Sequence, residues 1–200
     1  PFCRIGAEDC RFQLRKHAKN ASRRGRRGFN RGDCRVWALD SSGVKKGFIW
    51  ESGVMSELSI VGSPVEFQAN KINESGYIVG WSKLSTGGTR AITWTPDNVA
   101  SDIGTLGGTE AVCADINDSG MVVGSARDAG EVWTPYKWDA NNPMTELTIF
   151  TGWHGGARGV NNDNDIVGEA ELVYKGDKHA YLWDDGSVTD VGTLGGSDCW

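Results

Sequence analysis

The sequence lacks the features that mark membrane-spanning proteins, zinc proteins and the common enzyme families. It has no run of about 18 apolar residues, which a bilayer-spanning helix needs, and no signal peptide is visible. No stretch follows the helical period for long enough to predict a helix. The five cysteines lack paired Cys-x-x-Cys spacing, and there are only three histidines. A nucleophile elbow, a phosphate-cradling loop and a His-Glu-x-x-His pair are also missing, so no catalytic motif points to a reaction.

What the sequence does have is a tandem repeat of about 44 residues. Four tryptophans that each end a short apolar run lie 44, 44 and 45 residues apart: Trp50, Trp94, Trp138 and Trp183. Two further landmarks recur with a step of 44, namely a Val-Gly pair preceded by Ile or Val (78–80, 122–124, 166–168) and an apolar residue followed by Asn (72–73, 116–117, 160–161). Whole units therefore recur, not isolated residues.

Each unit predicts four short strands. In the unit at 111–155, the segment Asn117-Asp118-Ser119-Gly120 supplies the Asx, Ser and Gly residues of a tight hairpin turn. A strand rich in β-branched residues follows it, and two more strands flank a later turn. Four antiparallel strands in about 40 to 50 residues are typical of a β-propeller blade. We therefore predict an all-β fold, a β-propeller-like array of four-stranded antiparallel blades, with a β-solenoid as the alternative.

Charge divides the chain into two parts. Residues 1–31 have a net charge of +8, whereas residues 32–200 have a net charge of −13. We interpret 1–31 as a basic, non-repeat N-terminal extension and 32–200 as the repeat domain, with units at about 32–66, 67–110, 111–155 and 156–200. The first unit is 11 residues shorter between its turn and its Trp, so it is predicted to lack its second strand. The extension contains no recognisable nucleic-acid module, so nucleic acid is not favoured as a partner.

The repeat resembles the HAF repeat, a family of bacterial repeat proteins expected to be extracellular. His179-Ala180-Tyr181 stands for the His-Ala-Phe tripeptide, and the segments 103–108 and 191–196 stand for the family's Leu-Gly-Thr-Leu-Gly-Gly segment. The other three units depart from the tripeptide and two units depart from the glycine segment, and the resemblance covers about residues 32–200. It implies a propeller-like fold and a location outside the cell or in the cell envelope, and it supplies no catalytic residues.

One candidate ligand site lies where the repeat is broken. Trp153-His154-Gly155-Gly156 falls where the preceding unit has Thr109-Glu110-Ala111-Val112. Trp153 could stack on a sugar or another flat apolar face, with His154 as a hydrogen-bonding or general-base partner, which makes His154 the one candidate catalytic residue. A blade edge with locally altered packing is the alternative. Trp81 is a second candidate for ligand binding.

A candidate metal site lies in the hairpin turn of the last unit. Asn161, Asp163 and Asp165 alternate with other Asn residues, and their oxygens are ligands that calcium prefers. The segment lacks the Gly and the distal Glu of a complete calcium loop. Because the other units use the same turn with Ser and Gly, a plain Asx-rich turn is the alternative.

Two functions from different classes remain open at this point. The first is an exported binding or scaffold module for a carbohydrate, a surface polymer or a protein, which could complete a ring as a homo-oligomer. The second is a calcium-dependent hydrolase, a lactonase or esterase, with its site in the propeller channel. Propellers host many unrelated functions, so the fold alone does not decide between them.

Overall fold

The computed structural model describes residues 37–51, 54–150, 154–173 and 176–196, and all their regular structure is β. The predicted extension at 1–31 lies outside the described residues. The strands are β1 (Trp37–Leu39), β2 (Lys45–Glu51), β3 (Val54–Glu57), β4 (Pro64–Ile72), β5 (Ile78–Leu84), β6 (Thr89–Trp94), β7 (Ala100–Asp102), β8 (Gly107–Ile116), β9 (Val122–Asp128), β10 (Trp133–Asp139), β11 (Asn142–Glu146), β12 (Gly155–Val160), β13 (Ile166–Glu171), β14 (Lys178–Asp184) and β15 (Ser187–Gly192). No helix in this part of the chain is long and apolar enough to cross a membrane.

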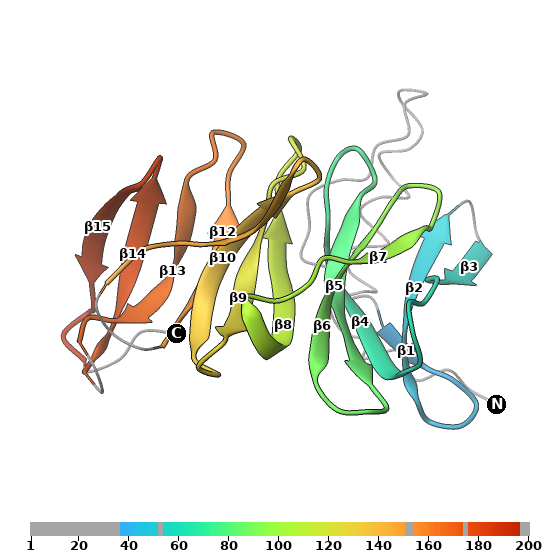
Figure 1. Ribbon diagram of the computed structural model, residues 1–200. Coiled ribbons are helices and arrows are strands. Elements are labelled where there is room, and N and C mark those ends of the chain that lie inside the picture. The colour runs from blue at the N-terminus through green and yellow to red at the C-terminus, as the bar shows by residue number, and fades with distance from the viewer. Residues whose placement is uncertain (1–36, 52–53, 151–153, 174–175, 197–200) are drawn as a thin grey trace.

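The strands form four sheets that follow one another in chain order. The first sheet is β1-β2-β3, and the second, third and fourth sheets are β4 to β7, β8 to β11 and β12 to β15. Figure 1 shows them as a row, with the first sheet near the N-terminal end and the fourth near the C-terminal end. Within each sheet, strands that are consecutive in sequence pair antiparallel, as in a propeller blade.

The prediction of an all-β array of repeated four-stranded antiparallel sheets is therefore confirmed. The described sheets form a row and not a closed barrel, which both a propeller-like arrangement and a solenoid allow. The first sheet has three strands among the described residues, as the shortened first unit predicts.

The same Asx turn joins the first two described strands of every sheet, and the Asn or Asp side chain at its first position closes it. In the third sheet, Asn117 Oδ1 accepts a hydrogen bond from the backbone N–H of Met121 at 2.9 Å, and the Gly120 N–H donates to the Asn117 carbonyl at 3.1 Å. Gly120 has a φ of 89°, which a glycine adopts without steric cost. Asn73, Asn161 and Asp40 close their turns in the same way, so the local sequence fixes the hairpins.

These turns also join neighbouring units. Asn73 Nδ2 donates to the Asn117 carbonyl at 3.0 Å, and Asn117 Nδ2 donates to the Asn161 carbonyl at 2.9 Å. Both steps span 44 residues, which is the length of the repeat. The asparagine ladder, as we name Asn73, Asn117 and Asn161, therefore holds successive units in register.

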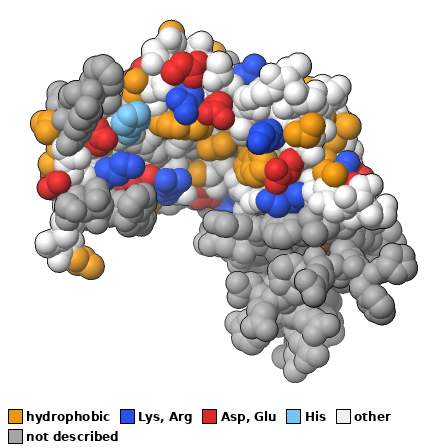
Figure 2. Space-filling view, turned by 90° about the horizontal axis from the view of Figure 1, so that it is seen from below, with side chains coloured by type: hydrophobic (Ala, Val, Ile, Leu, Met, Phe, Trp, Pro, Cys, Tyr) orange, Lys and Arg blue, Asp and Glu red, His pale blue; other side chains and the backbone are white. Residues whose placement is uncertain are grey.

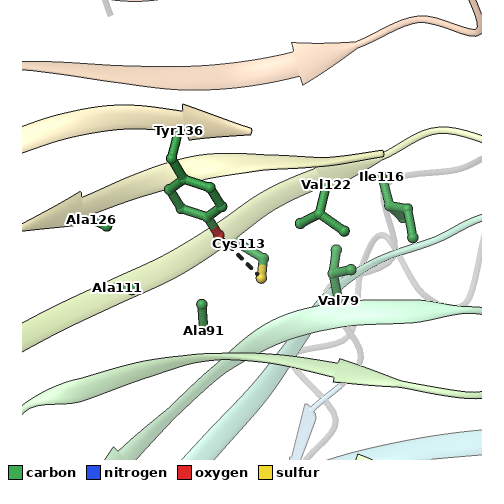
Figure 3. Packing of buried hydrophobic residues seen from close by; sticks show 8 residues of the cluster. All are labelled: Val79, Ala91, Ala111, Cys113, Ile116, Val122, Ala126 and Tyr136. Carbon is green, nitrogen blue, oxygen red and sulfur yellow. Dashed lines mark hydrogen bonds between the residues drawn. The ribbon is translucent and has the colours of Figure 1, made fainter. Parts of the chain in front are cut away.

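The apolar cores lie between the sheets, not within them. The core shown in Figure 3 joins Val79 and Ala91 of the second sheet to six residues of the third sheet: Ala111, Cys113, Ile116, Val122, Ala126 and Tyr136. Two equivalent cores join the first sheet to the second and the third sheet to the fourth. A single sheet would expose these side chains, so each unit depends on its neighbour for burial.

The second strand of each four-stranded sheet contains a glycine, because the backbone of the first strand passes very close to it. A Cβ atom at Gly80, Gly124 or Gly168 would lie 2.0 to 2.1 Å from a backbone carbonyl oxygen of the preceding strand. No L side chain fits at such a distance, which explains the Val-Gly pair in the repeat.

Candidate functional site

A small cleft opens between the third and fourth sheets. Its volume is about 80 Å³, and it is lined by Trp133, Thr134, Pro135, Glu146, Leu147, Thr148, Ile149, Phe150, His154, Gly155 and Ala170. Pockets that engulf a drug-sized ligand measure roughly 300 to 1,000 Å³, so this cleft is too small to enclose one. It can instead receive an edge or a substituent of a larger molecule that lies across its rim.

His154 lies at the rim of the cleft, where the broken repeat predicted a ligand site. Its side chain is exposed, and its carbonyl accepts a hydrogen bond from the Glu171 N–H at 2.9 Å, just before β12 begins. The neighbouring Trp153 lies outside the described residues. The structure therefore describes one of the two residues predicted to bind a ligand together. That residue, His154, lines the cleft.

Three further groups of the cleft were not predicted from the sequence. Trp133 and Phe150 are half-buried, and Glu146 is exposed at the end of β11. The Phe150 ring packs edge-on against Tyr181, with ring centroids 6.3 Å apart. The Arg127 guanidinium carbon lies 5.0 Å from the centre of the Trp133 ring. The available signal was Trp133 itself, which falls outside the series of tryptophans spaced about 44 residues apart.

Trp81 lies on β5 in the second sheet and is not part of the cleft lining. Its ring is half-buried, and Lys45 Nζ lies 5.9 Å from its centre. Lys45 also forms an ion pair with Glu66 at 2.8 Å. The structure therefore separates Trp81 from the site around His154, and any ligand binding at Trp81 would be independent of the cleft.

The predicted calcium loop is folded as an Asx turn. Asn161 Oδ1 accepts hydrogen bonds from the N–H groups of Asp163 and Asp165 at 3.0 and 2.8 Å. Asn161 Nδ2 donates to Asp165 Oδ2 at 2.7 Å. The oxygens of two of the three proposed ligands are thus engaged within the turn, in the pattern that Asn73 and Asn117 also show. Calcium binding here stays a prediction.

The first strands of the second, third and fourth sheets lie next to one another and carry charged groups that link the units. Asp115 Oδ1 lies 3.7 Å from Lys71 Nζ, and Asp115 Oδ2 accepts a hydrogen bond from the Val160 N–H at 3.1 Å. Among the described residues, no group of three or more His, Cys, Asp or Glu side chains could hold a metal ion. The calcium-dependent hydrolase therefore also stays a prediction.

Two buried groups that could be reactive are held in their neutral forms. Burial raises the pKa of the Cys113 thiol to about 12, and burial likewise raises the pKa of the Tyr136 hydroxyl well above its ordinary value. The hydroxyl donates to the Val112 carbonyl at 3.1 Å. It also lies 3.4 Å from Cys113 Sγ, and Figure 3 marks this contact with a dashed line. A thiol with this pKa is protonated at neutral pH, so Cys113 contributes to packing and not to nucleophilic chemistry.

Charged side chains on the face seen in Figure 2 are of both signs. Lys and Arg side chains lie among Asp and Glu side chains and are interspersed with hydrophobic ones. A surface of mixed sign gives no general attraction for a polyanion, so the described part of this face does not favour nucleic acid.

No protein-family model and no curated protein matches this chain. The likeness to the HAF repeat therefore stands on its sequence motifs, and the functional argument is built on the geometry of the cleft.

Proposed function

We propose that this protein is a binding module for a carbohydrate chain or a similar surface polymer, with the cleft between the third and fourth sheets as its site. The observation that supports the proposal is that half-buried aromatic rings and exposed polar side chains line the same cleft. Trp133 and Phe150 offer apolar ring surface, while Glu146, Thr148 and His154 offer hydrogen-bonding groups.

A polymer suits this site better than a small free ligand. The cleft holds only about 80 Å³, so most of a bound molecule would lie outside it. A polymer that runs across the cleft can add weak contacts on the surface beside it, which offsets the small burial at any one point. The resemblance to the HAF repeat supports a location outside the cell, where such polymers occur.

The proposal is tested by binding to a glycan array and by titration of the strongest glycan found. Glu146→Gln should weaken binding by about tenfold or more, because a hydrogen bond to a charged group contributes about 1.5 to 3 kcal/mol. His154→Ala should weaken it by roughly two- to tenfold, because it removes a hydrogen bond that contributes about 0.5 to 1.5 kcal/mol.

Glu57→Gln is the matched control. Glu57 pairs with Phe48 in the first sheet as Glu146 pairs with Tyr136 in the third, and both carboxylates are exposed. The control should bind like the unchanged protein. Equal losses in Glu57→Gln and Glu146→Gln, or no glycan bound at all, would exclude the cleft as a carbohydrate site.

A further inference from the structure

A carboxylate stands at an equivalent place on the last described strand of each sheet, and in three of the four sheets a basic side chain pairs with it. In the strand register, each of these carboxylates faces the residue two positions after its basic partner. The three pairs are Lys46 with Glu57 at 3.1 Å, Arg90 with Asp102 at 3.7 Å and His179 with Asp190 at 2.9 Å. The pair is therefore a feature of the repeat and not of one unit.

The third sheet keeps the carboxylate and lacks the base. Glu146 faces Tyr136, two positions after Thr134, so Thr134 stands where the other sheets have Lys, Arg or His. Thr134 is buried and carries no charge. Glu146 is exposed, and among the described residues its side chain forms neither an ion pair nor a hydrogen bond. Both residues line the cleft, so the cleft contains a carboxylate without its cation.

The contact between the first and second sheets shows how such a cation is held. Lys46 Nζ lies 3.1 Å from Glu57 Oε1 and 5.5 Å from the centre of the Phe67 ring, so one ammonium group contacts both a carboxylate and an aromatic ring. The cleft offers the same two kinds of group in Glu146 and Trp133, and none of its described lining residues is a lysine or an arginine. The ammonium group of a ligand can therefore take the place that the lysine has in the first sheet.

Arg127 lies close to the cleft, but its charge is already paired. Its guanidinium carbon is 5.0 Å from the centre of the Trp133 ring. Arg127 Nε lies 2.7 Å from Glu110 Oε2 and 3.7 Å from Glu131 Oε2, so two carboxylates offset one guanidinium. The charge of Glu146 is therefore not cancelled by this arginine. The whole chain has a net charge of −5, which also favours a cationic partner over an anionic one.

We propose that the polymer bound at the cleft is an amino-sugar polymer, whose ammonium groups pair with Glu146. This inference rests on the proposed carbohydrate site and names the class of sugar that the site selects. An ammonium group attached directly to a sugar ring lies beside the apolar face of that ring, so one sugar unit can present its charge to Glu146 and its ring to Trp133. The cleft of about 80 Å³ admits such a substituent while the rest of the polymer lies outside.

Titration calorimetry with a glucosamine oligomer and with the same oligomer in its N-acetylated form tests the inference, because acetylation removes the charge and keeps the sugar ring. At mildly acidic pH, at which the free amino groups are protonated, the glucosamine oligomer should bind at least about tenfold more tightly. Glu146→Gln should lose this preference. Glu57→Gln should keep it, because Glu57 is paired with Lys46 and lies in another sheet.

Thr134→Lys is a second test that leaves Glu146 in place. The new lysine should pair with Glu146 as Lys46 pairs with Glu57, so the preference for the glucosamine oligomer should disappear. Thr134→Gln is the matched control, since it adds a long polar side chain without a charge, and it should keep the preference. Both variants should keep the circular dichroism of the unchanged protein, because other sheets accommodate a long side chain at this position.

The outcomes separate this inference from the proposed function. Equal affinity for the two oligomers, or a preference that survives Glu146→Gln, would overturn the inference and leave the carbohydrate site standing. Tighter binding of a lysine oligomer than of the glucosamine oligomer would overturn it in favour of a basic peptide. Binding to other glycans but to neither oligomer would overturn the inference alone, whereas binding to no glycan would overturn the proposed function with it.

Discussion

Gly124→Ala is expected to destabilise the protein by about 3 kcal/mol or more, the upper end of the usual cost of overpacking. The new Cβ atom would lie 2.1 Å from the Val112 carbonyl oxygen and 3.0 Å from the Tyr136 hydroxyl. The carbonyl is part of the β8 backbone and cannot rotate away, so the first two strands of the third sheet would have to separate. That separation would also disturb the hydrogen bond from Tyr136 to Val112. Urea unfolding followed by tryptophan fluorescence measures the loss.

Gly159→Ala is the control, because the new methyl group would meet a side chain that can move and not a fixed backbone atom. Its Cβ atom would lie 3.3 Å from Cγ2 of Val167, which is the end of a half-exposed side chain. We expect a change within about 1 kcal/mol. Equal midpoints for Gly124→Ala and the unchanged protein would show that the close approach of β8 and β9 is not a property of the protein.

Trp94→Ala is expected to cost about 3 to 5 kcal/mol, because it leaves a large cavity between the first and second sheets. Trp94 is 1% exposed and packs with Leu58 and Phe67. Its indole N–H donates to the Ser59 carbonyl at 2.8 Å, so the substitution also removes a hydrogen bond that joins two units. Thermal and urea unfolding both report the effect.

Trp81→Ala serves as the control within the same sheet. Trp81 is only half-buried, and its substitution should cost clearly less than that of Trp94. Similar losses for Trp81→Ala and Trp94→Ala would contradict the assignment of Trp94 to the core between units.

The fold could be predicted from the sequence because its turns and strands depend on short-range residue patterns, and these patterns recur in every unit. The Asx turns depend on residues only two to four positions apart, as the hydrogen bonds that Asn117 Oδ1 accepts from Ser119 and Met121 show. The tryptophan series predicted burial between units, and Trp94 and Trp183 are indeed 1% and 7% exposed. Trp138 is only half-buried, which a spacing alone could not indicate.

The cleft could be predicted only in part, because its lining comes from strands of two different units. His154 was noticeable as a break in the repeat, but Trp133 and Thr134 of the third sheet line the same cleft as His154 only when the fourth sheet packs on the third. That packing depends on how side chains such as Leu147 and Tyr181 fill the space between the sheets. The order of residues along the chain does not indicate how closely side chains of two sheets approach each other.

The central claim is that successive units hold one another through equivalent positions 44 residues apart. Asn73 and Asn117 are buried and donate to the next unit, whereas the exposed Asn161 donates only within its own turn. Asn73→Ala, Asn117→Ala and Asn161→Ala remove the same turn-capping oxygen, but only the first two also remove hydrogen bonds to the next unit.

The free energy of unfolding of these three variants is therefore the most direct measurement. We predict that Asn73→Ala and Asn117→Ala each lose about 0.5 to 1.5 kcal/mol more than Asn161→Ala, because each removes a hydrogen bond from a buried side chain to the next unit. Three equal losses would contradict the account, since they would mean that these asparagines act only inside their own turns.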